Sequence, residues 1–276
     1  MGLTLGGLLL AAPLGVALLA WLVHWASLRQ QDDAPPHDEK RRGRFARPRA
    51  FLRARTSPGR LLGLQLTWSA LVLIAAGWVF GRLAEAVSSA GQLVLVDAQV
   101  AQWFHHHATP AMTQAMLGLS HLHGPTAISV MTVLVAAWLI RQRQWHSLSR
   151  IVLTVPTGLL LNVLVKQVFH RARPQFDEPL LTLSTYSFPS GHVAGTTLFY
   201  GVLCVLLWAR VDALGWRVAG VAAAMAVTTL VAVSRLYLGV HFLTDVLAGF
   251  AGALVWLTLC LFAIDAYWRR RADVHA

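Results

Sequence analysis

The sequence predicts an all-α protein that crosses a membrane several times as a polytopic helix bundle. Of its 276 residues, 56% are hydrophobic and 13% are charged, whereas about 25% of the residues in an ordinary soluble domain are charged. Uncharged apolar runs near the roughly 20 residues needed to span a bilayer recur along the chain. The 11 tryptophans fit side chains gathered at the two membrane–water interfaces.

The net charge of +11 does not indicate a nucleic-acid partner, because most of the cations lie in loops between apolar runs. Cys204 and Cys260 both lie inside apolar runs. These two cysteines therefore predict neither a disulfide framework nor a metal site.

The first two parts of the chain are a transmembrane helix at residues 1–28 and a basic cytoplasmic loop at residues 29–60. The apolar run has no charge apart from His24. A cleaved signal peptide is the alternative, and the absence of a basic residue before the run argues against it. The loop carries ten Lys and Arg against four acidic residues, so it also suits contact with anionic lipid headgroups.

A second span is expected at residues 61–83, followed by a mixed region at residues 84–123. Apolar side chains in this region lie on one face of a short helix, which predicts an amphipathic helix at the membrane surface: Leu93, Val96, Val100, Trp103 and Phe104. The triplet His105–His107 could bind a metal, but consecutive helical residues point in different directions, so the pattern disfavours a metal site.

Five more spans bring the predicted total to seven, and their boundaries follow the apolar runs: 124–140, 151–170, 190–209, 217–235 and 241–267. Residues 61–267 therefore form a six-helix core, and residues 268–276 form a basic cytoplasmic tail.

The distribution of cations predicts the orientation of the bundle. Eighteen of the 23 Lys and Arg lie in four segments that seven spans put on one side: 29–60, 141–150, 210–217 and 269–271. Basic loops stay in the cytoplasm, so we expect the N-terminus outside and the C-terminus inside a cell inner membrane. The remaining five lie at the outer ends of spans, against the charge rule: Arg82, Lys166, Arg171, Arg173 and Arg235.

Three sequence blocks gather most of these outer polar residues. The first runs from Lys166 to Arg173-Pro174, the second is Pro189-Ser190-Gly191-His192, and the third runs from Ser234-Arg235 through His241 to Asp245. Together they offer three cations, two histidines and one carboxylate, a set that suits a tetrahedral phosphate.

The spacing within the blocks adds local expectations. Lys166 and Arg173 are seven residues apart and share a face if the helix continues that far. Ser190 is a good N-cap with free amides behind it, and Gly191 permits a close approach to an oxyanion. His241 and Asp245, at i and i+4, are expected to meet, so that the carboxylate fixes the imidazole tautomer.

The three blocks resemble the signature of the type 2 phosphatidic acid phosphatase superfamily: K-x6-R-P, P-S-G-H and S-R-x5-H-x3-D. Every signature position is present, and the likeness covers residues 61–267. It gives no support to residues 1–60.

The resemblance implies an enzyme, a phosphatase that acts through a phosphohistidine with no metal and no cofactor. It implies that His241 attacks phosphorus, that Asp245 orients His241, and that His192 protonates the leaving oxygen and then activates water. The phosphoryl oxygens would be held by the remaining signature residues: Lys166, Arg173, Ser190, Gly191 and Arg235.

Two other function classes compete with a lipid phosphate phosphatase. A vanadate-dependent haloperoxidase shares the signature, but those enzymes are soluble and this chain is not. A non-catalytic lipid-binding or transport protein would suit a degenerate signature, and here it is intact. The expected partners are the membrane and a phospholipid or polyprenyl phosphate. Undecaprenyl diphosphate is favoured because that carrier is released where the site is expected to lie, and phosphatidylglycerol phosphate, phosphatidate and lipid A phosphate are the alternatives.

Overall fold

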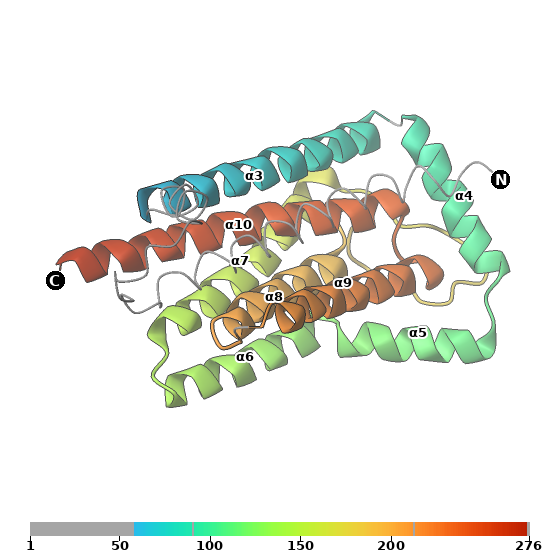
Figure 1. The fold of residues 1–276 in the computed structure, drawn as a ribbon. Coiled ribbons are helices and arrows are strands. Elements are labelled where there is room, and N and C mark those ends of the chain that lie inside the picture. Colours follow the sequence, from blue (N-terminus) through green and yellow to red (C-terminus); the bar gives the residue numbers. More distant parts are fainter. Residues whose placement is uncertain (1–57, 90, 212, 275–276) are drawn as a thin grey trace, which may run out of the picture.

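The computed structural model describes residues 58–274 except residues 90 and 212. The predicted helix at residues 1–28 and nearly all of the predicted loop at residues 29–60 lie outside this part of the chain. The described part is an all-helical bundle (Figure 1) with these elements: α3 Pro58–Ser88, α4 Gln92–His106, α5 Pro110–Leu122, α6 Pro125–Arg141, α7 Trp145–Phe169, α8 Gly191–Trp208, α9 Leu214–Tyr237 and α10 Leu243–Val274. The all-α membrane bundle that the sequence predicts is therefore confirmed.

Five of these helices are long and apolar enough to cross a membrane: α3, α7, α8, α9 and α10. Helices α5 and α6 meet the same test as a pair, with a bend of 43° between them. The bend falls at Gly124-Pro125, where a proline takes the first position of α6 and cannot continue the preceding helix. If the pair counts as one span, the described part contains six spans, but this one also includes α5 and so begins earlier than the predicted span at residues 124–140.

Helix α8 forms the centre of the bundle and contacts α6, α7, α9 and α10. It is apolar all round, as expected for a helix surrounded by others, and 72% of its residues are buried. The main apolar core is built around its side chains, with Leu198, Val202 and Val205 almost fully buried. The N-terminus of α8 is thereby fixed relative to three spans.

Helix α4 lies across one end of the bundle (Figure 1), where it contacts α3, α9 and α10. It occupies the region in which the sequence predicts a short amphipathic helix. Leu95 and Trp103 are exposed on its surface, whereas Asp97 is completely buried. An acidic side chain thus lies on the face of α4 that packs against the bundle.

The start of α8 packs directly on α10. The backbone N–H of Ser190, the N-cap of α8, donates to the backbone oxygen of Asp245 at 2.9 Å. One turn further along α10, Gly249 lies so close that a Cβ atom there would be 2.6 Å from the backbone oxygen of Ser190. Only glycine permits this approach of the two backbones.

Gly249→Ala is therefore expected to lower the unfolding temperature of the protein in detergent, because overpacking of this kind costs about 1–3 kcal/mol. Gly77→Ala in α3 is the matched control: its new Cβ would meet nothing within 4 Å, and alanine is the better helix former. Equal unfolding temperatures for the two variants would contradict the close contact.

Candidate active site

The three sequence blocks converge at the end of the bundle that α4 covers. The loop at residues 170–190 joins α7 to α8, and a turn at residues 238–242 joins α9 to α10. Both connections lie near α4 in Figure 1. The packing of α7, α8, α9 and α10 around one another thus brings the three blocks to a single site.

His241 and Asp245 meet as the spacing predicts, although His241 precedes α10 rather than lying on it. His241 Nδ1 is 3.5 Å from Asp245 Oδ2. The backbone N–H of Phe242 also donates to Asp245 Oδ2 at 2.8 Å, which is the reciprocal half of a capping box. The start of α10 therefore folds the carboxylate back toward the imidazole.

The imidazole of His241 is almost completely buried. Burial, aided by the nearby Arg173 and Arg235, lowers the pKa of His241 to about 3, although Asp245 acts in the opposite direction. The ring is therefore neutral at pH 7. Its Nε2 atom faces Arg173 Nη1 at 3.3 Å, while its other nitrogen faces Asp245.

The helix does not continue as far as Arg173, so the condition under which Lys166 and Arg173 would share one helical face is not met. Helix α7 ends at Phe169, and His170 then adopts a left-handed conformation with φ 47°, so Arg173 lies in the loop. The two cations still meet, because both donate to the backbone oxygen of Tyr186, Lys166 Nζ at 2.6 Å and Arg173 Nη2 at 3.1 Å. The two cations are therefore brought together by the fold of the loop and not by a continuous helix.

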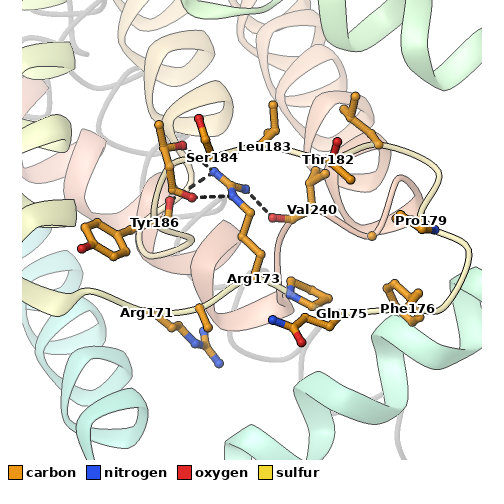
Figure 2. Close-up of a pocket in the computed structure, with 15 residues that line it drawn as sticks. Arg171, Arg173, Gln175, Phe176, Pro179, Thr182, Leu183, Ser184, Tyr186 and Val240 are labelled. Atoms are coloured by element: carbon orange, nitrogen blue, oxygen red, sulfur yellow. Dashed lines mark hydrogen bonds between the residues drawn. The ribbon is translucent and has the colours of Figure 1, made fainter.

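Arg173 reaches across the loop toward the segment that precedes α8 and toward Val240 (Figure 2). Its guanidinium donates to the Val240 oxygen at 2.5 Å and to the Thr185 oxygen at 2.7 Å. It lies between two cavities. One, of about 480 Å³, is lined by the loop itself, and the other, of about 900 Å³, lies between the loop and α4.

Arg235 supplies the third cation from the last turn of α9 and is 1% exposed. Its Nη1 atom donates to the Ser120 hydroxyl on α5. Its Nε and Nη2 atoms are buried without a hydrogen-bond partner in residues 58–274 as described, and so is Ser190 Oγ. Buried donors without partners are rare, so these atoms are suited to an anionic ligand.

The second block places Ser190, Gly191 and His192 at the first turn of α8. Ser190 is the N-cap, as predicted, but its hydroxyl makes no capping hydrogen bond. A Cβ on Gly191 would lie 3.1 Å from Asn162 Oδ1, and a Cβ on Gly124 would lie 3.5 Å from His192 Nε2. His192 therefore points toward the α5–α6 bend.

Sequence reasoning missed a set of polar residues around Asp245. Ser187 donates its hydroxyl to Asp245 Oδ2, and Arg171 Nη1 donates to Asp245 Oδ1 at 2.5 Å. Arg171 also pairs with Asp97 of α4 at 2.7 Å. The available signals were weak: Arg171 is one of the five cations on the outer side, and Asp97 is an acid in an apolar helix.

The histidine triplet on α4 does not converge. His105 stacks on Phe176 at 4.1 Å, whereas His106 and His107 each bond to a backbone oxygen one turn back in the same helix. Within the described part of the chain, no group of three or more His, Cys, Asp or Glu is placed to hold a metal ion.

Comparisons with known proteins agree with this geometry. The sequence model of the PAP2 superfamily matches residues 147–269. Phosphatidylglycerophosphatase B of Bacillus subtilis (strain 168) is 35% identical over 149 residues, which are 51% of this chain and 70% of that protein. A probable lipid phosphate phosphatase beta of Arabidopsis thaliana is 27% identical over 197 residues, or 63% of this chain and 90% of the relative.

A solved structure is also similar. It is the crystal structure of a transmembrane PAP2 type phosphatidylglycerolphosphate phosphatase from Bacillus subtilis, with a TM-score of 0.63 and 29% identity over 72% of this chain and 96% of that chain. The sequence matches and the shared fold show that this membrane-spanning chain belongs to the PAP2 superfamily and is a lipid phosphatase.

Proposed function

We propose that the chain hydrolyses a lipid phosphate through a phosphohistidine on His241, without a metal ion. The observation that carries this proposal is the arrangement around the imidazole. A neutral His241 presents Nε2 to Arg173 at 3.3 Å, and buried donors of Arg235 and Ser190 in the same site have no partner in the described residues. A phosphoryl group would accept hydrogen bonds from these donors next to the attacking nitrogen.

In the first step, His241 Nε2 attacks phosphorus, and the bond from phosphorus to the leaving oxygen breaks as the new P–N bond forms. His192 gives its proton to the leaving oxygen. Asp245 accepts the Nδ1–H of His241, so it fixes the tautomer and stabilises the positive charge that develops on the ring. No other base is needed, because Nε2 carries the lone pair that attacks.

The cations hold the phosphoryl oxygens during this step. Lys166 and Arg173 are fixed by backbone carbonyls, and Arg235 is fixed by Ser120. The Ser190 hydroxyl and the Gly191 amide at the start of α8 add uncharged donors. Donors fixed in advance around developing charge supply most of the stabilisation in phosphoryl transfer.

In the second step, water hydrolyses the phosphohistidine. His192, now neutral, takes a proton from the water, the oxygen attacks phosphorus, and the P–N bond breaks. The electron pair returns to His241 Nε2, and inorganic phosphate leaves. The free enzyme is restored with its original protons, so the cycle balances without a metal or a cofactor.

Phosphatidylglycerol phosphate is the first substrate to test. The relative that is 35% identical is a phosphatidylglycerophosphatase, and the solved structure with a TM-score of 0.63 is a phosphatidylglycerolphosphate phosphatase. Undecaprenyl diphosphate is the second candidate, because the cation distribution predicts a site on the outer side of the membrane. Both offer a terminal phosphoryl group at the membrane surface.

Phosphate release by the purified full chain from a panel of lipids tests the substrate and the absence of a metal together. The panel is phosphatidylglycerol phosphate, undecaprenyl diphosphate, phosphatidate and a lipid A phosphate, each with and without EDTA, and His241→Ala is the control. We expect phosphatidylglycerol phosphate to be hydrolysed fastest and EDTA to have no effect. Loss of activity in EDTA that one divalent metal restores would reject the mechanism.

Replacing each of the two histidines by alanine is expected to change the activity on lipid phosphate and on p-nitrophenyl phosphate in different ways. His241→Ala removes the nucleophile, so lipid phosphate and p-nitrophenyl phosphate should both remain uncleaved. General acid catalysis contributes about 10²–10⁴-fold, and p-nitrophenolate needs that proton less, so His192→Ala should retain far more activity on p-nitrophenyl phosphate than on lipid. Base-stable, acid-labile phosphate on the protein should require His241. If this label persists in His241→Ala and disappears in His192→Ala, the roles are reversed.

The predicted orientation can be measured with single cysteines at the two ends of α7. The first variant is Thr182→Cys, in the loop after α7. The second is Gln142→Cys, just before the start of α7. Both positions are exposed. In intact cells, a membrane-impermeant maleimide should label position 182 directly and position 142 only after permeabilisation, with the parent chain as the control. The opposite pattern would place the site on the cytoplasmic side.

A further inference from the structure

Asp97 is a buried carboxylate to which the mechanism above gives no part. Its side chain has no exposed surface, and it lies on α4, outside residues 147–269 that the family model matches. A buried acid is costly unless hydrogen bonds and a cation compensate for the lost water. Its contacts therefore indicate what it does.

Two hydrogen bonds of Asp97 come from Thr244 at the start of α10. Asp97 Oδ1 accepts from the backbone N–H of Thr244 at 2.9 Å, and Oδ2 accepts from the Thr244 hydroxyl at 2.5 Å. Thr244 is the second residue of α10, where a backbone N–H has no partner inside the helix. Asp97 thus caps the helix that carries Asp245, from an element 147 residues earlier in the sequence.

Arg171 connects Asp97 to Asp245. Its Nη2 atom donates to Asp97 Oδ2 at 2.7 Å, and its Nη1 atom donates to Asp245 Oδ1 at 2.5 Å and to the Thr244 hydroxyl at 2.7 Å. The guanidinium also lies over the ring of Phe242, 4.4 Å from its centroid. One cation is therefore held between two buried carboxylates.

The two carboxylate oxygens of Asp245 therefore have different partners. Oδ1 is engaged by Arg171, so Oδ2 is the oxygen that faces His241, Ser187 and the Phe242 amide. If Arg171 moved, the carboxylate could rotate about its own axis and lose its alignment with Nδ1 of His241. Asp97 is the group that holds the far side of Arg171 in place.

We propose that Asp97 is a positioning residue: through Arg171 and the N-terminus of α10, it holds Asp245 in the orientation that aligns His241 for attack. The proposal rests on the proposed function, because it assigns Asp97 an effect on the His241–Asp245 pair. It also gives α4 a part in the reaction that the three signature blocks do not contain. Burial raises the pKa of Asp97 even though Arg171 opposes that change, so the charge of this carboxylate depends on its partner.

The experiment compares Asp97→Asn with the parent chain in detergent. Asparagine keeps an oxygen that can accept from Thr244 N, so the helix cap is retained, but it removes the charge that holds Arg171. We expect kcat to fall roughly 10–100-fold, by analogy with the loss of activity when groups that orient metal ligands are replaced. KM should stay within about threefold, because the phosphate-binding cations are unchanged. Phosphohistidine formation should slow in proportion to kcat.

Asp265→Asn is the matched control. Asp265 is also a buried carboxylate paired with an arginine, Arg150, at 2.7 Å, but it lies near the opposite end of α10 from the site. Loss of this pair should lower the unfolding temperature while kcat per folded molecule stays near that of the parent. An equal loss of kcat in both variants would show that Asp97 matters only for folding.

A double-mutant cycle with Asp245→Asn tests whether Asp97 acts through Asp245. In the Asp245→Asn background, Asp97→Asn should reduce kcat by less than about twofold further, because residues that act as one unit are not additive. Fully multiplicative losses would overturn the positioning role, and so would an unchanged kcat in Asp97→Asn alone. If Asp245→Asn itself leaves kcat intact, the proposed mechanism fails first, and the positioning role fails with it.

Discussion

The buried carboxylate of Asp245 is the group on which the rest of the site depends. A charge with no exposed surface must recover the free energy of its lost hydration from fixed partners. Its partners here come from three segments: Arg171 after α7, Ser187 before α8, and the Phe242 amide before α10. The α7–α8 loop, with Arg171 and Ser187 near its two ends and Arg173 and Tyr186 between them, therefore cannot move independently of the turn before α10.

The same constraint acts on Lys166 and Arg173, the cations that we propose bind the phosphate. Lys166 and Arg173 donate to backbone oxygens of the loop that Ser187 ties to Asp245. Side-chain carboxylates would have neutralised these cations, whereas carbonyls orient them and leave their positive charge available. Such a site is preorganised for a dianionic phosphoryl group, because its donors need little rearrangement during the reaction.

The two ends of the bundle use buried ion pairs for different purposes. At the end away from the site, Arg150 and His146 both bond to Asp265, which joins the start of α7 to α10. At the α4 end, Arg171 joins two carboxylates, Asp97 and Asp245, beside the buried His241. A buried pair adds little net stability by itself, so the network around Asp245 is better understood as a means of fixing geometry than as a source of stability.

The sequence by itself determined the all-α membrane class, the five long spans α3, α7, α8, α9 and α10, the short helix before the α5–α6 pair and the family. These features depend on local properties: the length of apolar runs, the prolines and glycines that end helices, and the fixed spacing of the signature residues. The tertiary structure decided that α7 ends at Phe169, so that Arg173 meets Lys166 through a loop. It also decided which distant residues complete the site, since Asp97 and Arg171 are 74 residues apart and Ser120 and Arg235 are 115 apart. Such pairs depend on how the helices pack. A local sequence pattern does not predict which distant polar residues are buried next to each other and form hydrogen bonds.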